Sequence, residues 1–306
     1  MGKVNYKGGE YMKDYVIITD STVDLPLDII EKINIGIIPM AFDMENITYT
    51  HYPDEREMTS HEFYERLKNG DTSVTTQINY FTYRECFEKL LKEGKDILYI
   101  AFSSGLSGTY NNSQLVIQDL KEEYPERKII SVDSLSASVG EGLLVYNAVM
   151  KKEEGLAIEE LVKWIEEHRN NTCHWFTVED LHHLKRGGRI SSVEAIIGTT
   201  LKIKPVLSVD YEGKLVNVSK VRGDKKSLEK LLDKMLEDGA NLKEQTIIIG
   251  HADSLERAEY LANIIREKEL VKDIIISTIG PIIGTHTGQG MIGLTFMGNQ
   301  KRGACK

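Results

Sequence analysis

The sequence is poor in the residues that mark a secreted or metal-binding protein. Only three of its 306 residues are cysteine, and Cys86, Cys173 and Cys305 form an odd, widely spaced set. This usage is typical of reduced cytosolic thiols and not of a disulfide framework or a zinc site. The pair His182-His183 has no further partner at ligand spacing, so we expect no metal.

Long hydrophobic runs are also missing. The most apolar stretch, residues 274–283, is broken by four residues, Ser277, Thr278, Gly280 and Pro281. A membrane-spanning helix needs about 20 predominantly apolar residues. No signal-peptide hydrophobic region is recognisable near the start, where residues 1–13 resemble an untidy leader. We therefore expect a cytoplasmic protein without a membrane span, for which peripheral membrane contact stays open.

Positive charge is scarce overall but locally concentrated. The formal net charge is −9, which argues against broad nucleic-acid binding. Residues 181–230 nevertheless carry eleven basic and five acidic side chains, a local net charge of +6. This stretch is either a solvated surface or a docking surface for phosphate or an acidic partner, and the pattern leaves both open.

Neither a Walker-type phosphate loop nor a G-x-G-x-x-G motif follows the first predicted strand, so the sequence does not indicate a nucleotide-binding site. Short apolar runs instead alternate with helical patterns. We expect strands at 15–19, 35–39, 96–102 and 128–132, and helices at 26–32, 59–70, 79–93, 106–123 and 137–150. This alternation predicts βαβ units and a parallel sheet.

The pattern changes near residue 172. A hairpin is expected at 206–221, followed by strands at 246–251 and 273–278 and a glycine-rich final strand. The sequence therefore predicts two α/β domains with the ligand between them. Residues 14–171 are expected to form a Rossmann-like parallel-sheet domain, and residues 172–300 a mixed-sheet domain.

Small hydroxyl residues cluster just after the predicted strands, at 19–22, 103–109 and 133–134. In a parallel sheet these positions share the carboxyl edge, where ligands usually bind. Thr75-Thr76 is expected just before a helix, where hydroxyls and free backbone N–H groups favour an anion. Each hydroxyl alone is a common cap or turn residue, but clusters at one edge predict a binding site.

The segment Gly105-Leu106-Ser107-Gly108-Thr109 nearly matches the G-x-S-x-G nucleophile elbow, with Thr109 in place of the last glycine. An acyl hydrolase that uses Ser107 with His286 is therefore an alternative function. The same residues also suit a backbone nest with hydroxyl donors. Two glycine-rich segments, 185–191 and 280–290, are each either a binding loop or an ordinary connection.

Taken together, these segments resemble the DegV family of lipid-binding proteins, which includes the fatty-acid-carrying subunits of bacterial fatty acid kinase. The resemblance covers nearly the whole chain and depends on the order and spacing of its segments. They are Ile18 to Leu25, Thr75-Thr76-Gln77, Ser103 to Tyr110, Asp133-Ser134, Arg186 to Ser191, Lys202 to Pro205 and Gly284 to Gly290.

The resemblance implies that the chain binds a long-chain fatty acid such as palmitate in a buried tunnel, without a cofactor. Thr75 and Ser107 would hydrogen-bond the carboxylate, and Arg189 and His286 would complete its network. Arg222 would cooperate with a separate kinase that forms an acyl phosphate. The chain would then be a non-catalytic carrier in lipid transport or metabolism.

The sequence departs from the family pattern at one place. The family's T-S-Q-P-S segment reads Thr75-Thr76-Gln77-Ile78-Asn79 here, without the proline. The first threonine and the glutamine are kept. This change affects the predicted entry angle of the following helix but not the predicted head-group hydroxyl.

Overall fold

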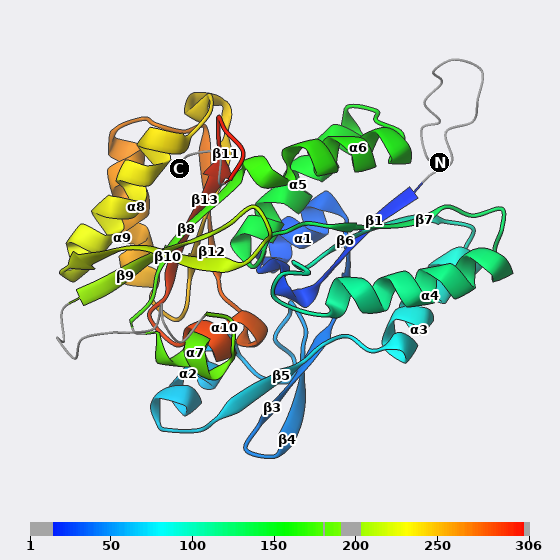
Figure 1. Ribbon diagram of the computed structural model, residues 1–306, viewed down its shortest axis with the longest axis horizontal. Coiled ribbons are helices and arrows are strands. Elements are labelled where there is room, and N and C mark those ends of the chain that lie inside the picture. Colours follow the sequence, from blue (N-terminus) through cyan, green and yellow to red (C-terminus); the bar gives the residue numbers. More distant parts are fainter. Residues whose placement is uncertain (1–14, 180, 191–202, 303–306) are drawn as a thin grey trace.

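The computed structural model describes residues 15–179, 181–190 and 203–302, which form three sheets with helices packed around them (Figure 1). Residues 1–14, Ser191, Lys202 and Cys305, which the sequence analysis singled out, lie outside the described residues. None of the helices in these ranges is both long and apolar enough to cross a bilayer.

The first half of the chain forms a four-stranded parallel sheet. In spatial order its strands are β2 (Gly36–Ile38), β1 (Tyr15–Asp20), β6 (Asp96–Ala101) and β7 (Ile129–Asp133). Every residue of β6 is buried, as expected for a parallel strand covered on both faces. The hydroxyl clusters after β1, β6 and β7 therefore share one edge, as predicted.

Helices flank this sheet. They are α1 (Leu27–Ile33), α3 (Tyr80–Lys92), α4 (Thr109–Glu123), α5 (Val139–Glu153) and α6 (Ile158–His168), with short 3-10 turns η1 (Ser21–Val23) and η2 (Arg169–Asn171). Asn79 caps α3 by accepting a hydrogen bond from the Thr82 amide at 3.0 Å. The helix predicted from residue 106 begins only at Thr109, because Ser103–Gly108 turns back on itself first.

A third, three-stranded antiparallel sheet was not predicted. Its spatial order is β4 (Ile47–His51), β3 (Met40–Met44) and β5 (Ser73–Thr76), and α2 (Ser60–Lys68) lies between β4 and β5 along the chain. Thr75 and Thr76 precede α3 as predicted, but they lie in β5, and residues 77–79 separate them from the start of the helix. The alternating segment from Ser73 pairs with β3, where Thr75 lies opposite Phe42, and α3 begins only at Tyr80.

The second half of the chain forms a six-stranded mixed sheet. Its strands, in spatial order, are β10 (Leu215–Arg222), β9 (Ile203–Val209), β8 (Thr172–Thr177), β13 (Ile292–Met297), β11 (Thr246–His251) and β12 (Asp273–Thr278). Its helical elements are α7 (His182–Arg186), α8 (Asp224–Asp238), η3 (Leu242–Glu244), α9 (Leu255–Glu267) and α10 (Pro281–Thr287). The predicted hairpin and the predicted strands at 246–251 and 273–278 are confirmed.

The glycine-rich segment after β12 folds differently from a connecting loop. Residues Pro281–Thr287 form α10, with Pro281 in the first turn, where its missing N–H costs nothing. The helix ends at Gly288, whose φ of +72° is a conformation that glycine adopts without strain. The helix therefore gives His286 a fixed direction, which a flexible loop would not.

The two large sheets share one core. Helices α8 and α9 cover one face of the six-stranded sheet, and α5 packs on β8, β11 and β13 from the other side (Figure 1). The main hydrophobic cluster runs from the parallel sheet through α5 to Phe176 and Leu207 of the mixed sheet. The predicted fold class is confirmed. The predicted boundary between residues 171 and 172 falls between η2 and β8 and stays a prediction, since the core crosses it.

Candidate ligand-binding site

A cavity of about 240 Å³ lies where the parallel sheet, α10 and the mixed sheet meet. Its wall is largely apolar, and one side carries polar groups. The apolar part includes Met40, Phe102, Leu106, Val139, Phe176, Leu184, Val209, Leu215, Ile282, Ile283 and Met291. The polar part includes Thr75, Gln77, Ser107, Arg189 and His286.

Thr75 and His286 meet across the cavity wall. The alternation of β5 turns Ser73 and Thr75 to the same face, toward α10. There the Ser73 Oγ lies 2.8 Å from the Thr285 Oγ1, and the Thr75 Oγ1 lies 2.9 Å from the His286 Nε2. Strand β5 and helix α10 thus bring together residues that are more than 200 positions apart in the sequence. Each element fixes the direction of its own side chains.

Burial controls the protonation of His286. Burial lowers its pKa to about 4, and the nearby positive charges of Arg189 and His183 act in the same direction. The imidazole is therefore neutral near pH 7. Its Nδ1 is buried without a hydrogen-bond partner in the described ranges and packs against Gly187, where a Cβ would lie only 2.2 Å away.

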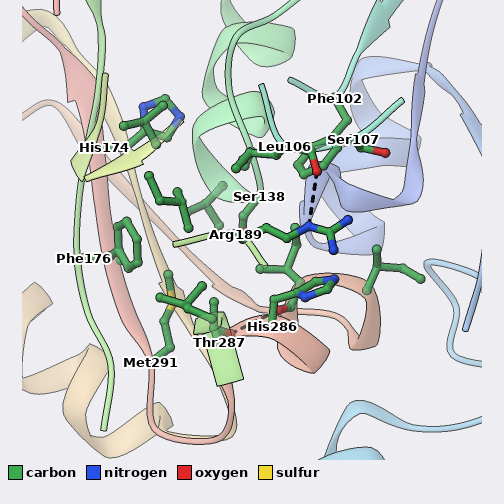
Figure 2. A pocket seen from close by; sticks show the side chains of 18 of the residues that line it. Phe102, Leu106, Ser107, Ser138, His174, Phe176, Arg189, His286, Thr287 and Met291 are labelled. Atoms are coloured by element: carbon green, nitrogen blue, oxygen red, sulfur yellow. Dashed lines mark hydrogen bonds between the residues drawn. The ribbon is translucent and has the colours of Figure 1, made fainter. Parts of the chain in front are cut away.

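Arg189 supplies the positive charge of the site. Its Nε donates to the Leu106 carbonyl at 3.2 Å, and its Nη1 donates to the Gly187 carbonyl at 2.5 Å. Figure 2 shows Arg189 and His286 on the side of the cavity where Ser107 lies, with Phe176 and Met291 on the opposite side. Burial lowers the pKa of Arg189, but a guanidinium stays charged at neutral pH. An anion beside it would offset the cost of burial.

Ser107 sits at the start of α4. Its Oγ lies 2.8 Å from the Thr109 Oγ1 and accepts from the Thr109 amide at 3.3 Å. The neighbouring Gly108 allows Gln77 to approach closely, since a Cβ there would lie 2.2 Å from the Gln77 Oε1. A hydroxyl beside a helix N-terminus favours an anion.

The four predicted head-group residues, Thr75, Ser107, Arg189 and His286, all line this one cavity. The fifth predicted site residue, Arg222, does not; it lies exposed at the end of β10. The apolar wall was not predicted as part of the site. These positions look like ordinary core residues in the sequence, and only the fold shows that they surround a space.

The geometry does not favour the serine-hydrolase alternative. A nucleophilic serine needs a base within hydrogen-bond reach and a third group that orients the base. The Ser107 hydroxyl instead bonds Thr109, and the His286 Nε2 bonds Thr75. The other ring nitrogen of His286 has no partner among the described residues, so no carboxylate in this part of the chain orients the imidazole.

A cluster of buried carboxyl groups lies behind the cavity wall. Asp20 accepts from the Phe102 amide at 3.2 Å and from the Tyr99 hydroxyl at 2.8 Å. The single hydroxyl of Thr22 lies 2.5 Å from Asp20 Oδ1 and 2.9 Å from Glu141 Oε2. A hydroxyl has only one proton to donate, so both contacts are satisfied when one carboxyl is protonated. Burial raises the pKa of both carboxyls, consistent with this sharing.

Asp24, in the same cluster, joins the two halves of the chain. It accepts from the cavity-lining Ser138 hydroxyl at 2.6 Å and from the Gly280 amide at 2.9 Å. Burial raises its pKa from 3.8 to about 7. The folded state therefore favours protonated Asp24, and this stability is lost as the pH rises from about 4 to about 7.

We expect Asp24→Asn to become more stable relative to the native chain as the pH rises. Asparagine stays neutral in both states, whereas Asp24 ionises in the unfolded chain and stays protonated in the folded chain, which costs the native protein about 1.4 kcal/mol per pH unit within that window. The measurement is the free energy of unfolding of both proteins at pH 5, 6 and 7. Both proteins contain His51 and His286, whose lowered pKa values make the free energy of unfolding rise with pH. This contribution cancels when the two free energies are subtracted. A difference independent of pH would contradict the raised pKa.

Comparison with known proteins places the chain in a family. The family model described as "Uncharacterised protein, DegV family" matches residues 14–299. A DegV domain-containing protein of Clostridium perfringens is 46% identical over 290 residues, which is 95% of this chain and 99% of that protein. A second one, from Lactococcus lactis, is 36% identical and covers 94% of this chain and 99% of its own.

Solved structures agree in fold. A DegV lipid-binding protein from Thermotoga maritima has a TM-score of 0.81 at 31% identity, covering 94% of this chain and all of its own. A DegV family protein from Thermus thermophilus, whose structure is described as showing fatty acid binding, has a TM-score of 0.84 at 28% identity. The alignment with it covers 93% of this chain and 99% of that chain. Because the family model matches residues 14–299 and the two curated relatives are 46% and 36% identical over nearly their whole length, the chain belongs to the DegV family.

Proposed function

We propose that this protein binds one long-chain fatty acid, with the carboxylate at Thr75, Ser107, Arg189 and His286 and the acyl tail along the apolar wall. The observation that carries the proposal is the division of one cavity into a polar side and an apolar side. The related proteins of Thermotoga maritima and Thermus thermophilus, described as lipid-binding and fatty-acid-binding, support it.

The head group matches the chemistry of the polar side. A fatty acid is ionised at neutral pH, so its two oxygens only accept hydrogen bonds and need donors on the protein. Thr75 and Ser107 offer hydroxyl donors, and Arg189 offers charge. The one N–H of neutral His286, placed on Nε2, donates to the Thr75 oxygen and leaves the Thr75 hydroxyl proton for the ligand. The guanidinium lies between the Ser107 loop and α10, so one carboxylate could contact donors from both halves of the chain.

Burial of the tail dominates the affinity. A sixteen-carbon chain gains roughly 0.8 kcal/mol per buried methylene, or on the order of 11 kcal/mol before costs. Ordering and association subtract several kcal/mol. The polar residues therefore set the orientation of the ligand and its preference for a carboxylate, and the apolar wall supplies most of the binding energy.

The test of this function compares palmitate with 1-hexadecanol, which has the same tail without a charged head. We expect palmitate to bind with 1:1 stoichiometry and at least tenfold more tightly than the alcohol, because a charge-assisted hydrogen bond contributes roughly 1.5–3 kcal/mol. Isothermal titration at pH 7.5 gives both constants. Equal affinities for palmitate and 1-hexadecanol would show that the polar residues do not recognise a carboxylate.

We also propose that the bound carboxylate is presented in the cytoplasm to a separate kinase, which converts it to an acyl phosphate. The protein itself then acts as a non-catalytic carrier that needs no cofactor of its own. The proposal draws on the exposed basic surface formed by Lys220 and Arg222 of β10 with Lys225 and Lys226 of α8. An acidic surface on the kinase would complement these side chains.

Arg222→Ala is expected to leave palmitate affinity within about twofold and to lower acyl-phosphate formation with the cognate kinase about tenfold. The reason is that Arg222 is exposed and does not line the cavity, so its loss removes a charge contact between proteins. The measurement is acyl hydroxamate formed from palmitate, ATP and kinase. Lys243→Ala removes an exposed charge from η3 and serves as the matched control. Normal output from Arg222→Ala would refute the docking role.

A further inference from the structure

Within the described residues, the Ser107 side chain hydrogen-bonds Thr109 of its own segment, and other residues hold this segment in place. The segment 103–108 connects β6 to α4, and its amides at Leu106 and Ser107 both donate to the Ser103 carbonyl at 3.1 Å. Ser103 is completely buried. The turn that presents Ser107 is thus built on one residue four positions earlier.

The Ser103 side chain ties this turn to the far half of the chain. Its hydroxyl accepts from the Gly105 amide at 3.1 Å and donates to the Gly213 carbonyl at 2.8 Å. Gly213 lies in the β9–β10 hairpin, which reaches from the mixed sheet toward the parallel sheet (Figure 1). A residue 110 positions away in the sequence therefore closes the hydrogen-bond network of the head-group loop.

The hairpin is shaped for this contact. Asp210 Oδ1 accepts from the amides of Glu212 and Lys214, both at 2.9 Å, which fixes the turn. Gly213 has a φ of +76°, and a Cβ there would lie 2.1 Å from the Ser103 Oγ. On the facing loop, a Cβ at Gly105 would lie 2.5 Å from the Glu212 carbonyl oxygen. The two backbones meet where both partners are glycine.

We propose that Ser103 is a positioning residue for carboxylate recognition, acting through Ser107, and that the hairpin turn 210–214 is part of the head-group site. The inference rests on the proposed function and adds residues that do not line the cavity. The hydroxyl of Ser103 fixes the turn relative to the mixed sheet, and Arg189, which follows α7, donates to the Leu106 carbonyl of the same turn. Without the Ser103 bond, Ser107 and Arg189 would no longer be held at a constant separation.

The experiment compares the dissociation constants for palmitate and for 1-hexadecanol in Ser103→Ala. We expect palmitate to bind about tenfold more weakly, since a buried carbonyl loses its partner and the turn relaxes. The alcohol should change less than twofold, because the apolar wall is untouched. Ser227→Ala removes another fully buried hydroxyl, one that donates to the Asp224 carbonyl on α8. This control should leave both constants unchanged.

A positioning role also predicts non-additivity. The double variant Ser103→Ala with Ser107→Ala should bind palmitate no more than about twofold more weakly than Ser107→Ala alone. Gly213→Ala approaches the same contact from the other side and should show the same selective loss. It serves as the test if Ser103→Ala does not fold.

An equal loss for palmitate and the alcohol would overturn the proposal by showing a general structural role. Unchanged palmitate binding, or full additivity in the double variant, would also overturn it. Failure of the native chain to prefer palmitate over the alcohol would instead refute the proposed function, and this inference with it. The native chain and the variants thus distinguish the two failures.

Discussion

The variant Gly293→Leu is expected to bind palmitate more than about 100-fold more weakly than the native chain. Gly293 lies in β13 and lines the cavity. A Cβ built there meets Met291, Val139 and Phe176 at 3.2, 3.7 and 3.8 Å, all residues of the apolar wall. A leucine would therefore occupy space that the acyl tail needs.

The size of this effect follows from tail burial. A leucine side chain displaces about four methylenes, each worth roughly 0.8 kcal/mol, for a loss of about 3 kcal/mol. Titration with saturated acids of eight to eighteen carbons measures the loss against chain length. We expect the affinity for short acids to be nearly unchanged and the affinity for long acids to fall most.

The matched control for this variant is Gly36→Leu. Gly36 lies in β2, is exposed and does not line the cavity, and a Cβ there meets Ile18 at an ordinary 3.4 Å. This control should fold and bind every acid like the native chain. If Gly293→Leu folds and still binds palmitate like the control, the tail does not lie along the apolar wall.

Ser107→Ala is expected to weaken palmitate binding by about 10- to 100-fold without unfolding the protein. A hydrogen bond to a charged group contributes roughly 1.5–3 kcal/mol, and Ser107 is only partly buried. Among the described residues, its hydrogen-bond partners are the side chain and the amide of Thr109. Fluorescence or calorimetric titration measures the affinity, and thermal unfolding checks the fold.

Ser104→Ala is the control for Ser107→Ala. Ser104 belongs to the same turn, is exposed and does not line the cavity. Its backbone amide, which donates to Asp133 Oδ1, is kept in the variant. We expect native affinity for palmitate. Retained affinity in Ser107→Ala would count strongly against the head-group assignment.

Much of the fold could be predicted because hydrophobic patterns act locally. The buried run of β6 and the cap at Asn79 were recognisable from the sequence, and both elements formed where expected. The three-stranded sheet was missed because β3 and β5 are short, and their pairing joins residues about 30 positions apart. The segment 280–290 was misjudged because its glycines suggested a loop, whereas Pro281 begins a helix.

The candidate site, like the fold, was predictable only in part. Thr75, Ser107, Arg189 and His286 were recognisable through the family resemblance, and the fold brings them to one cavity. The contact between Ser103 and Gly213 carries no signal in the sequence, since a serine and a glycine 110 positions apart are ordinary turn residues until the two halves pack. The apolar wall was hidden for the same reason.

The most direct test of the central claim is native mass spectrometry of the freshly purified protein. We predict one bound species per chain, with a mass that matches a long-chain fatty acid and that exchanges with added palmitate. Extraction of the ligand would then identify its chain length. A protein that carries no such mass, and that takes up none after incubation with excess fatty acids of fourteen to twenty carbons, would contradict the account.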